Sequence, residues 1–209
     1  MGTRSGAELV TVIAATRLEA WAVRRAVRGA RIVRAGVGLT RLRPQEVGQL
    51  VVTCGLAGGV RPGLATGSVV VPTRVLRPGG GWLACDPSLV ESLVAAARRL
   101  GMEPDQGPLG TAPALVHGAA RASWASRGCV AVDMETGLLT APRVATVRVV
   151  LDTPERDLSE EWRRPAQVLA HPAVWGEAVW LCREAPRCAR RAAAVLAEAL
   201  RAYIGNGAA

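Results

Sequence analysis

The stretch VVTCGLAGGVRPGLATGSVVVPTRV, residues 51–75, decides the fold of this chain. It begins and ends with runs of β-branched residues, and the glycine-rich CGLAGG at 54–59 lies between them. Runs of β-branched residues are typical of buried strands, and glycines at a strand end let the backbone approach a ligand closely. We therefore predict strands at 50–54 and 67–76, with a glycine-rich turn after the first.

Strand-like and helical patterns alternate on both sides of this stretch. LVTVIAA at 9–15 is followed by RLEAWAVRRAV at 17–27, in which apolar residues recur at helical spacings. Pro172 and Pro186 are well placed to start helices. Further strands are expected at 31–37, 106–111, 129–133 and 144–151, and further helices at 87–100, 172–184 and 187–204.

These patterns indicate an α/β protein. Strands dominated by apolar residues favour a buried sheet, so we expect a central mixed sheet flanked by helices. The length of 209 residues suits one domain. We therefore expect a single domain over 1–209, with a helical C-terminal extension from about residue 165.

The charge balance is strongly basic. The 26 basic residues are all arginines, and the formal net charge is +9. Such a charge attracts polyanions in general, but the arginines are spread from Arg4 to Arg201, and no basic run is interleaved with stacking aromatics. We therefore expect no nucleic-acid binding. No apolar run approaches the roughly 20 residues that span a bilayer, and the C-terminal pattern is typical of a packed surface helix rather than a membrane anchor.

The cysteines indicate neither a metal site nor a disulfide framework. They lack the paired short spacings of zinc ligands, and their number is odd. We expect no metal, reduced thiols and a cytoplasmic location. The five residues are Cys54, Cys85, Cys129, Cys182 and Cys188.

Acidic residues follow three of the expected strands. Glu19 comes after the first strand, Glu135 ends VDME at 132–135, and Asp152 ends RVVLD at 148–152. Each has a structural alternative: Glu19 could complement a helix dipole, Glu135 could be a solvated helix residue, and Asp152 could be a cap. Met134 could belong to the core. Their order along the chain is more informative than any one of them.

The glycines allow two interpretations as well. Gly36 and Gly38 flank Val37 at the end of a strand, and Gly55, Gly58 and Gly59 lie in CGLAGG. Backbone N–H groups in such turns can hold an anion or a polar ring. The glycines could also serve only to permit a positive φ in a tight turn. Neither segment matches a dinucleotide-binding fingerprint or a P-loop.

Taken together, these segments resemble the superfamily of purine nucleoside phosphorylases and methylthioadenosine/adenosylhomocysteine nucleosidases, whose fold is a three-layer α/β architecture. The tail is similar to that of the hopanoid-associated phosphorylases, which remove adenine from adenosylhopane. The superfamily resemblance rests on IAATRLEA at 13–20, AGVGLT at 35–40, the stretch at 51–75, AVDMET at 131–136 and RVVLD at 148–152. The tail resemblance rests on RVVLDTPERDL at 148–158 and on 169–200.

The resemblance implies a role for each acid. Asp152 matches the residue that protonates the departing purine, and general acid catalysis of this kind contributes ~10²–10⁴-fold. Glu135 matches the acceptor of the two ribose hydroxyls, with Met134 against the sugar. Glu19 matches the residue that holds the attacking water in the nucleosidases.

The resemblance also implies which small residues border the substrate. Gly36, Gly38, Ala57 and Gly58 belong to its two glycine motifs. Pro113 and Ala114 occupy positions that stack on or hydrogen-bond the purine in relatives. The lone histidines His117 and His171 are expected to be structural or surface residues.

Some features depart from the family pattern. Leu56 and Leu151 stand where relatives commonly have serine, and the segments 39–50 and 136–147 are too short for two helices that the family usually carries. These losses keep a degenerate nucleoside-binding protein without turnover as an alternative. Phosphorolysis is a second alternative, in which Arg17, Arg34, Arg41 or Arg148 would hold the phosphate.

The expected activity is therefore hydrolysis of a purine nucleoside, with adenosylhopane or another 5′-substituted adenosine as substrate. No cofactor is expected, although phosphate would be the co-substrate of a phosphorylase. Relatives are usually homo-oligomers, and so we expect a homo-oligomer, often a dimer. A lipid-borne substrate would also bring peripheral membrane contact.

Overall fold

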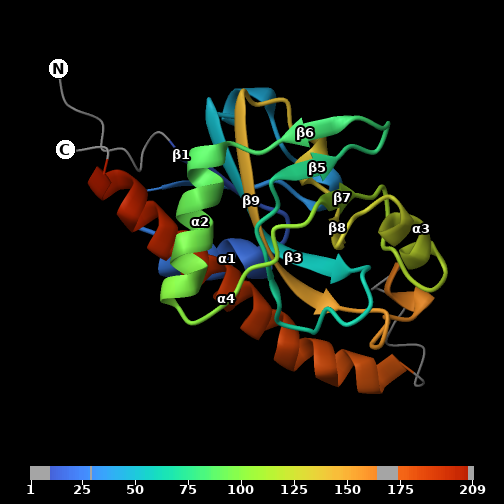
Figure 1. Ribbon diagram of the computed structural model, residues 1–209. Coiled ribbons are helices and arrows are strands. Elements are labelled where there is room, and N and C mark those ends of the chain that lie inside the picture. Colours follow the sequence, from blue (N-terminus) through green and yellow to red (C-terminus); the bar gives the residue numbers. More distant parts are fainter. Residues whose placement is uncertain (1–9, 29, 164–173, 207–209) are drawn as a thin grey trace.

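Within residues 10–28, 30–163 and 174–206, which the computed structural model describes, nine strands form one mixed sheet (Figure 1). The strand order is β2-β1-β3-β8-β7-β5-β6, and β9 pairs with both β3 and β4. The strands are β1 (Val10–Ala14), β2 (Arg31–Arg34), β3 (Leu50–Gly59), β4 (Val69–Val70), β5 (Arg74–Leu76), β6 (Trp82–Ala84), β7 (Leu109–Thr111), β8 (Ala131–Asp133) and β9 (Arg143–Asp152).

The centre of the sheet consists of parallel strands. β3 pairs with β1 on one side and with β9 on the other, both in parallel register. These strands are buried along nearly their whole length, which accounts for their apolar, β-branched sequence. The last residues of β3 also pair with β8 in the antiparallel direction. β3 therefore connects the two halves of the sheet, and the glycines of CGLAGG lie at this connection.

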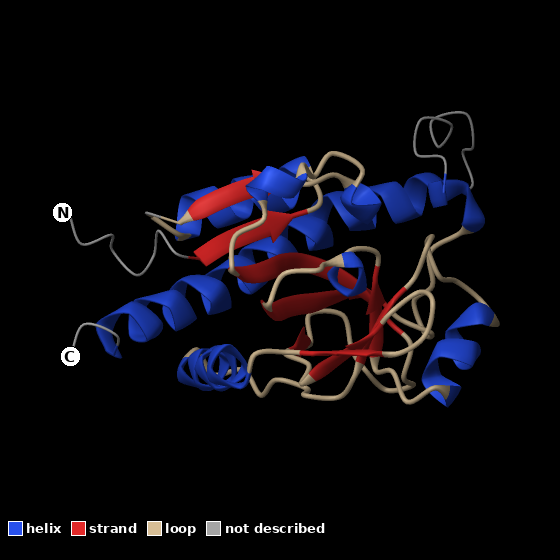
Figure 2. Ribbon diagram, turned by 90° about the horizontal axis from the view of Figure 1, so that it is seen from above, coloured by secondary structure: helices blue, strands red, loops and turns tan. Residues whose placement is uncertain are grey.

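Helices cover one face of the central strands (Figures 1 and 2). The C-terminal helix α4 (Trp175–Asn206) contacts α1 (Arg17–Ala26), α2 (Pro87–Arg99), β3 and β9. Buried residues recur along α4 every three or four positions from Cys188 to Leu200, as expected for a helix with one face in the core. This face of α4 joins the largest apolar cluster of the molecule.

Short 3₁₀ turns occupy the two segments that the sequence marked as too short for helices. One such turn, Val37–Leu39, ends where the first segment begins, Pro44–Glu46 forms another within it, and Thr136–Leu138 forms one in the second. Leu39, Leu42 and Val47 pack against a smaller buried cluster on the face opposite α4. The fold class is confirmed, with 3₁₀ turns in place of two helices.

The predicted boundaries were wrong in two places. The run at 67–76 is two strands with different partners, because Pro72 has no N–H and interrupts the ladder between them. The helices expected at 172–184 and 187–204 are one helix that continues through Pro186. Its contacts with α1, α2 and the sheet hold both halves in line. Pro172, and the start of the helical extension near residue 165, lie outside the described residues.

Two elements were not predicted. β6 pairs with β5 as an antiparallel hairpin, and the short helix α3 (Ala120–Ser126) follows a loop beyond β7. Neither has a strong sequence pattern, because two of the three residues of β6 are exposed and α3 has only seven residues, with Arg121 as its one buried residue. The part of the chain that the structure describes contains no helix long and apolar enough to cross a membrane.

Candidate active site

The end of β9 is irregular where it passes β3. Ala57 of β3 pairs with Val150, but the next residue, Gly58, pairs with Asp152, so that Leu151 is an extra residue in β9. In a regular strand, successive side chains point to opposite faces, whereas a bulge redirects them. Both Leu151 and Asp152 consequently line the same cavity. The bulge thus turns Asp152 towards the site predicted for it.

Asp152 is buried and paired with a cation. Arg121 of α3 donates from Nη2 to Asp152 Oδ2, and also to Asp157 Oδ1 at 2.6 Å. Burial raises the pKa of Asp152 above its usual range, and the neighbouring Arg121 opposes part of this rise. The cap alternative for Asp152 finds no support, since its carboxylate contacts Arg121.

Glu19 reaches the cavity from the first turn of α1. Its Oε2 accepts hydrogen bonds from the N–H of Thr16 at 2.7 Å and from Thr16 Oγ1 at 2.8 Å, which completes a capping box. Its Oε1 accepts from the N–H of Leu56 in β3 at 2.8 Å. Glu19 is therefore both a first-turn acid and a site residue, and three donors fix its carboxylate.

The glycines of CGLAGG serve close approach rather than a turn. The residues at 54–59 lie in β3, and none of Gly55, Gly58 and Gly59 has a positive φ, so the predicted turn was wrong. A Cβ at Gly55 would lie well inside 3.0 Å of Glu19 Oε1 and at 3.0 Å from Arg148 Nη1. A Cβ at Gly58 would lie 3.3 Å from Asp152 Oδ2. The missing side chains leave space for functional groups.

Glu135 is held at the other end of the cavity. It is buried, and its Oε1 accepts from the N–H of Gly38 at 3.1 Å. Gly36 and Gly38 both have a positive φ, as their turn predicted. Burial raises the pKa of Glu135 to about 7, although Arg148 acts against this rise. Gly38 therefore positions Glu135, and of this turn only Val37, between the two glycines, lines the cavity.

Behind Glu135 lies an ion pair that sequence reasoning missed. Arg148 is 2% exposed and donates from Nη2 to Asp133 Oδ2 at 2.7 Å, and Glu135 Oε2 lies 3.4 Å from the same nitrogen. Asp133 also accepts from Thr111 Oγ1 at 2.7 Å and from Thr136. The sequence did contain a sign of these two residues, because Asp133 lies within the motif AVDMET and Arg148 begins the motif RVVLD. Only the fold brings the two motifs into contact.

The three predicted acids converge on one cavity of about 200 Å³. Its walls are mostly apolar. Pro113 is exposed and lies outside the lining, His117 does not line it, and His171 is outside the described residues. The lining residues from the predicted set are Glu19, Ala57, Gly58, Ala114, Met134, Glu135 and Asp152, together with apolar residues that include Val37, Leu56, Leu115, Val116, Leu151 and Leu158.

Three of the four arginines considered for phosphate binding lie away from the cavity. Arg17, Arg34 and Arg41 are exposed and do not line the cavity. Arg148 is buried beside it, with Nη2 bonded to Asp133. Its Nε has no hydrogen-bond partner among the residues that the structure describes. Arg148 is therefore the one cation of this group close to the site.

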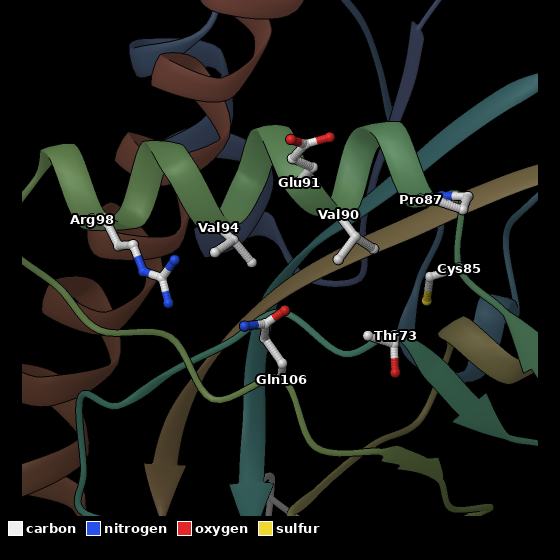
Figure 3. Close-up of a pocket in the computed structure, with 8 residues that line it drawn as sticks. All are labelled: Thr73, Cys85, Pro87, Val90, Glu91, Val94, Arg98 and Gln106. Carbon is white, nitrogen blue, oxygen red and sulfur yellow. The ribbon is translucent and has the colours of Figure 1, made fainter.

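A second hollow of about 370 Å³ lies against α2 (Figure 3). Val90 and Val94 form its helical wall, and Cys85, Thr73 and Gln106 lie opposite. Burial raises the pKa of the Cys85 thiol to about 12, which leaves it protonated and unreactive at neutral pH. This hollow contains none of the residues predicted for chemistry, and the candidate active site is the smaller cavity.

A known family model matches most of the chain. Residues 47–204 match the family model described as the phosphorylase superfamily. No curated protein matches the chain in a sequence search.

Solved structures share the fold. A 5′-methylthioadenosine/S-adenosylhomocysteine nucleosidase from Neisseria meningitidis superposes with a TM-score of 0.71 and 19% identity, covering 93% of this chain and 99% of that one. The nucleosidase from Streptococcus pyogenes gives 0.71 and 18%, covering 94% and 98%. Futalosine hydrolase from Helicobacter pylori gives 0.70 and 12%, covering 92% and 97%. At these identities, the likeness concerns the fold.

Proposed function

The chain belongs to the phosphorylase superfamily, and we propose that it hydrolyses the N-glycosidic bond of a purine nucleoside. The observation that carries this proposal is the convergence of Glu19, Glu135 and Asp152 on one apolar cavity. Cleavage of the bond builds positive charge on the ribosyl carbon and negative charge on the leaving base. Carboxylates stabilise the first, and a carboxylic acid neutralises the second.

In this proposal, Asp152 is the general acid at the base. It gives its proton to N7 of the purine while the bond from N9 to the ribosyl carbon breaks. Its buried position supports the role, because burial raises its pKa and so favours the protonated form that a general acid needs. Ala114 and Gly58 would then border the purine, since both line the cavity beside Asp152.

Glu135 and Met134 form the ribose end. The Glu135 carboxylate is held by the N–H of Gly38, and it can accept hydrogen bonds from the 2′- and 3′-hydroxyls. Met134 lines the cavity beside it and would lie against the sugar. If 2′-deoxynucleosides react as well as ribonucleosides, this assignment fails.

The position of Glu19 favours water over phosphate. A carboxylate beside the anomeric carbon orients a neutral water and stabilises the developing cation, but it repels a phosphate dianion. Arg17, Arg34 and Arg41, which could offset this repulsion, lie outside the lining. Within the described part of the chain, Nε of Arg148 has no hydrogen-bond partner, and this observation favours phosphorolysis as the second candidate.

We propose adenine as the base and a large apolar group on the 5′ carbon. The apolar walls of the cavity and the tail similar to hopanoid-associated phosphorylases support adenosylhopane. Apolar surface buried at ~25 cal/mol per Å² would favour a triterpenoid group strongly over a hydroxyl. A cytoplasmic homo-oligomer with weak, peripheral membrane contact would suit this substrate.

The test is adenine release from adenosine, methylthioadenosine and adenosylhopane, each with and without phosphate. The proposal expects release in phosphate-free buffer with a free ribosyl product, and adenosylhopane as the most efficient substrate. A strict phosphate requirement with a ribose 1-phosphate product would establish phosphorolysis instead. More efficient turnover of adenosine would exclude the large 5′ group. Asp152→Asn protein, prepared in parallel, controls for contaminating nucleosidases.

Retained binding without release would identify a non-catalytic nucleoside-binding protein. The leucines at 56 and 151 motivate this outcome, because both line the cavity where relatives commonly have a hydroxyl.

A further inference from the structure

Arg121 is a buried cation that lies behind the proposed general acid. It is 3% exposed and does not line the cavity. Nη2 donates to Asp152 and to Asp157, Nε donates to Asp157 Oδ1 at 3.0 Å, and Nη1 donates to the carbonyl of Gly59. One guanidinium is therefore shared by two carboxylates.

The two carboxylates differ in their access to water. The side chain of Asp152 is 6% exposed and faces the cavity, whereas that of Asp157 is 31% exposed and also accepts from the N–H of Gly118. With both acids ionised, the cluster carries a net charge of −1. A proton on Asp152 leaves a neutral pair of Arg121 and Asp157, and burial favours placing the proton on the less exposed acid.

We propose that Arg121 and Asp157 are positioning residues that decide when Asp152 carries the proton for the leaving base. Arg121 holds the ionised Asp152 in place between turnovers, and Asp157 retains the guanidinium once Asp152 is protonated. This inference rests on the proposed function. Charge balances over a turnover, because the proton that Asp152 gives to the purine N7 is replaced by the proton that the attacking water releases.

Other titratable groups surround the cluster. Glu19 from α1, Asp133 of β8 and Glu135 after β8 line the same cavity, Glu155 lies on the loop before Asp157, and His117 precedes α3. None of these residues is changed when Arg121 or Asp157 is replaced. Differences between variants therefore report the cluster itself.

The proposal predicts pKa shifts of opposite sign. Asp157→Asn removes a negative charge and leaves Asp152 as the only carboxylate beside Arg121, so the pKa of Asp152 should fall by about one unit or more. Arg121→Met removes the cation, so the same pKa should rise by a similar amount. A role of Arg121 and Asp157 in packing alone, without an effect of their charges on Asp152, would not produce opposite signs.

The measurement is a ¹³C NMR titration of protein labelled at the aspartate carboxyl groups. The chain has only five aspartates, and Asp152→Asn assigns the signal. Glu155→Gln and Arg127→Met are matched controls, because they remove an acid from the same loop and an arginine from the position directly after α3. Each should leave the pKa of Asp152 within about half a unit. Unchanged values, or shifts of the same sign in both test variants, would overturn the proposal.

The NMR readout needs no turnover, so it separates this inference from the proposed function. If the enzyme is active, the alkaline limb of kcat/KM should move with the NMR pKa in each variant, and a limb that stays fixed would overturn the proposal. If no nucleoside is cleaved, the proposed function fails while the titration still tests the cluster.

A second variant covers the case in which Arg121→Met does not fold. Arg121→Lys keeps the cation and should keep the pKa of Asp152 near the wild-type value. A rise of a full unit would contradict the role of charge.

Discussion

Two buried arginine–aspartate pairs border the cavity, one through Asp133 and one through Asp152, and they are built differently. Arg148 and Asp133 lie on β9 and β8, both side chains are at most 2% exposed, and hydroxyls of Thr111 and Thr136 also bind Asp133. Arg121 comes from the short helix α3, and its pair with Asp152 shares the guanidinium with the partly exposed Asp157.

The difference shows how one kind of interaction serves two purposes. At the end proposed to bind ribose, both members of the pair lie on strands, two threonine hydroxyls also bind Asp133, and Arg148 lies 3.4 Å from Glu135 Oε2. At the base end, the cation has a second partner, so one member of the pair can change protonation without leaving a buried charge alone. The following predictions test this contrast between a fixed and an exchangeable pair.

The largest effect is expected from Asp152→Asn at the base end. The amide keeps the shape of the side chain but cannot donate the proton, so kcat should fall by ~10²–10⁴-fold while the fold survives. Asp157 still neutralises Arg121, so the thermal midpoint should change little. Initial rates of adenine release and calorimetry check both parts. Asp105→Asn, which alters a pair with the exposed Arg61, is the control and should retain wild-type rates. Activity within a few-fold of wild type would remove Asp152 from its role.

Arg148→Met should be the most damaging change to stability at the ribose end. Asp133 and Glu135 would remain buried without their cation, and loss of one partner from a buried pair costs about 3–5 kcal/mol. Urea unfolding measures the loss. Arg61→Met breaks an exposed pair and should cost at most about 1 kcal/mol. Equal losses of unfolding free energy in Arg148→Met and Arg61→Met would show that the buried pair contributes no more to stability than the exposed one.

A smaller loss of stability is expected from adding a methyl group at Gly55 or at Gly58, the two glycines of β3 that lie close to the acids of the site. In Gly55→Ala, the new Cβ meets the fixed Glu19 and Arg148, so overpacking should cost about 1–3 kcal/mol of unfolding free energy and lower kcat. In Gly58→Ala, the nearest atom is Asp152 Oδ2 at 3.3 Å, and the smaller conflict should cost less. Paired urea unfolding curves rank the two variants, and a larger loss for Gly58→Ala would reverse the contrast.

The smallest effect concerns pH. Because the pKa of Glu135 is raised to about 7, its ionised fraction falls as the pH drops below 7, and ribose hydroxyls lose their acceptor. kcat/KM should therefore decrease on the acidic side by up to about tenfold per pH unit. Glu135→Gln should have a raised KM and a lowered kcat, and its profile should lack this acidic limb. An unchanged limb in that variant would assign it to another group.

Much of the fold followed from local patterns. The apolar runs at β1, β3 and β9 and the capped helices α1 and α2 were identified because burial and capping leave marks on neighbouring residues. The continuous helix through Pro186 was not, since proline disfavours a helix interior and only tertiary contacts offset that cost.

For the candidate site, the sequence indicated the three acids but not the arginine behind Asp152. Glu19, Glu135 and Asp152 follow strand ends within recognisable motifs, and all three line one cavity. Arg121 was missed because its only signal is an arginine among many in a segment without a clear pattern. Arg121 and Asp152 are 31 positions apart in the sequence, so the sequence gives no sign of their direct contact.

The sequence by itself indicated most of the strands and helices, the glycines that leave space in β3, and the identity of the three acids. These are local properties, which depend on side-chain volume, hydrogen-bonding groups and spacing along the chain. Only the tertiary structure decided that a bulge turns Asp152 into the cavity and that Arg148 and Arg121 stand behind different acids. Ion pairing and burial depend on distances between segments remote in sequence, so no local pattern could contain them.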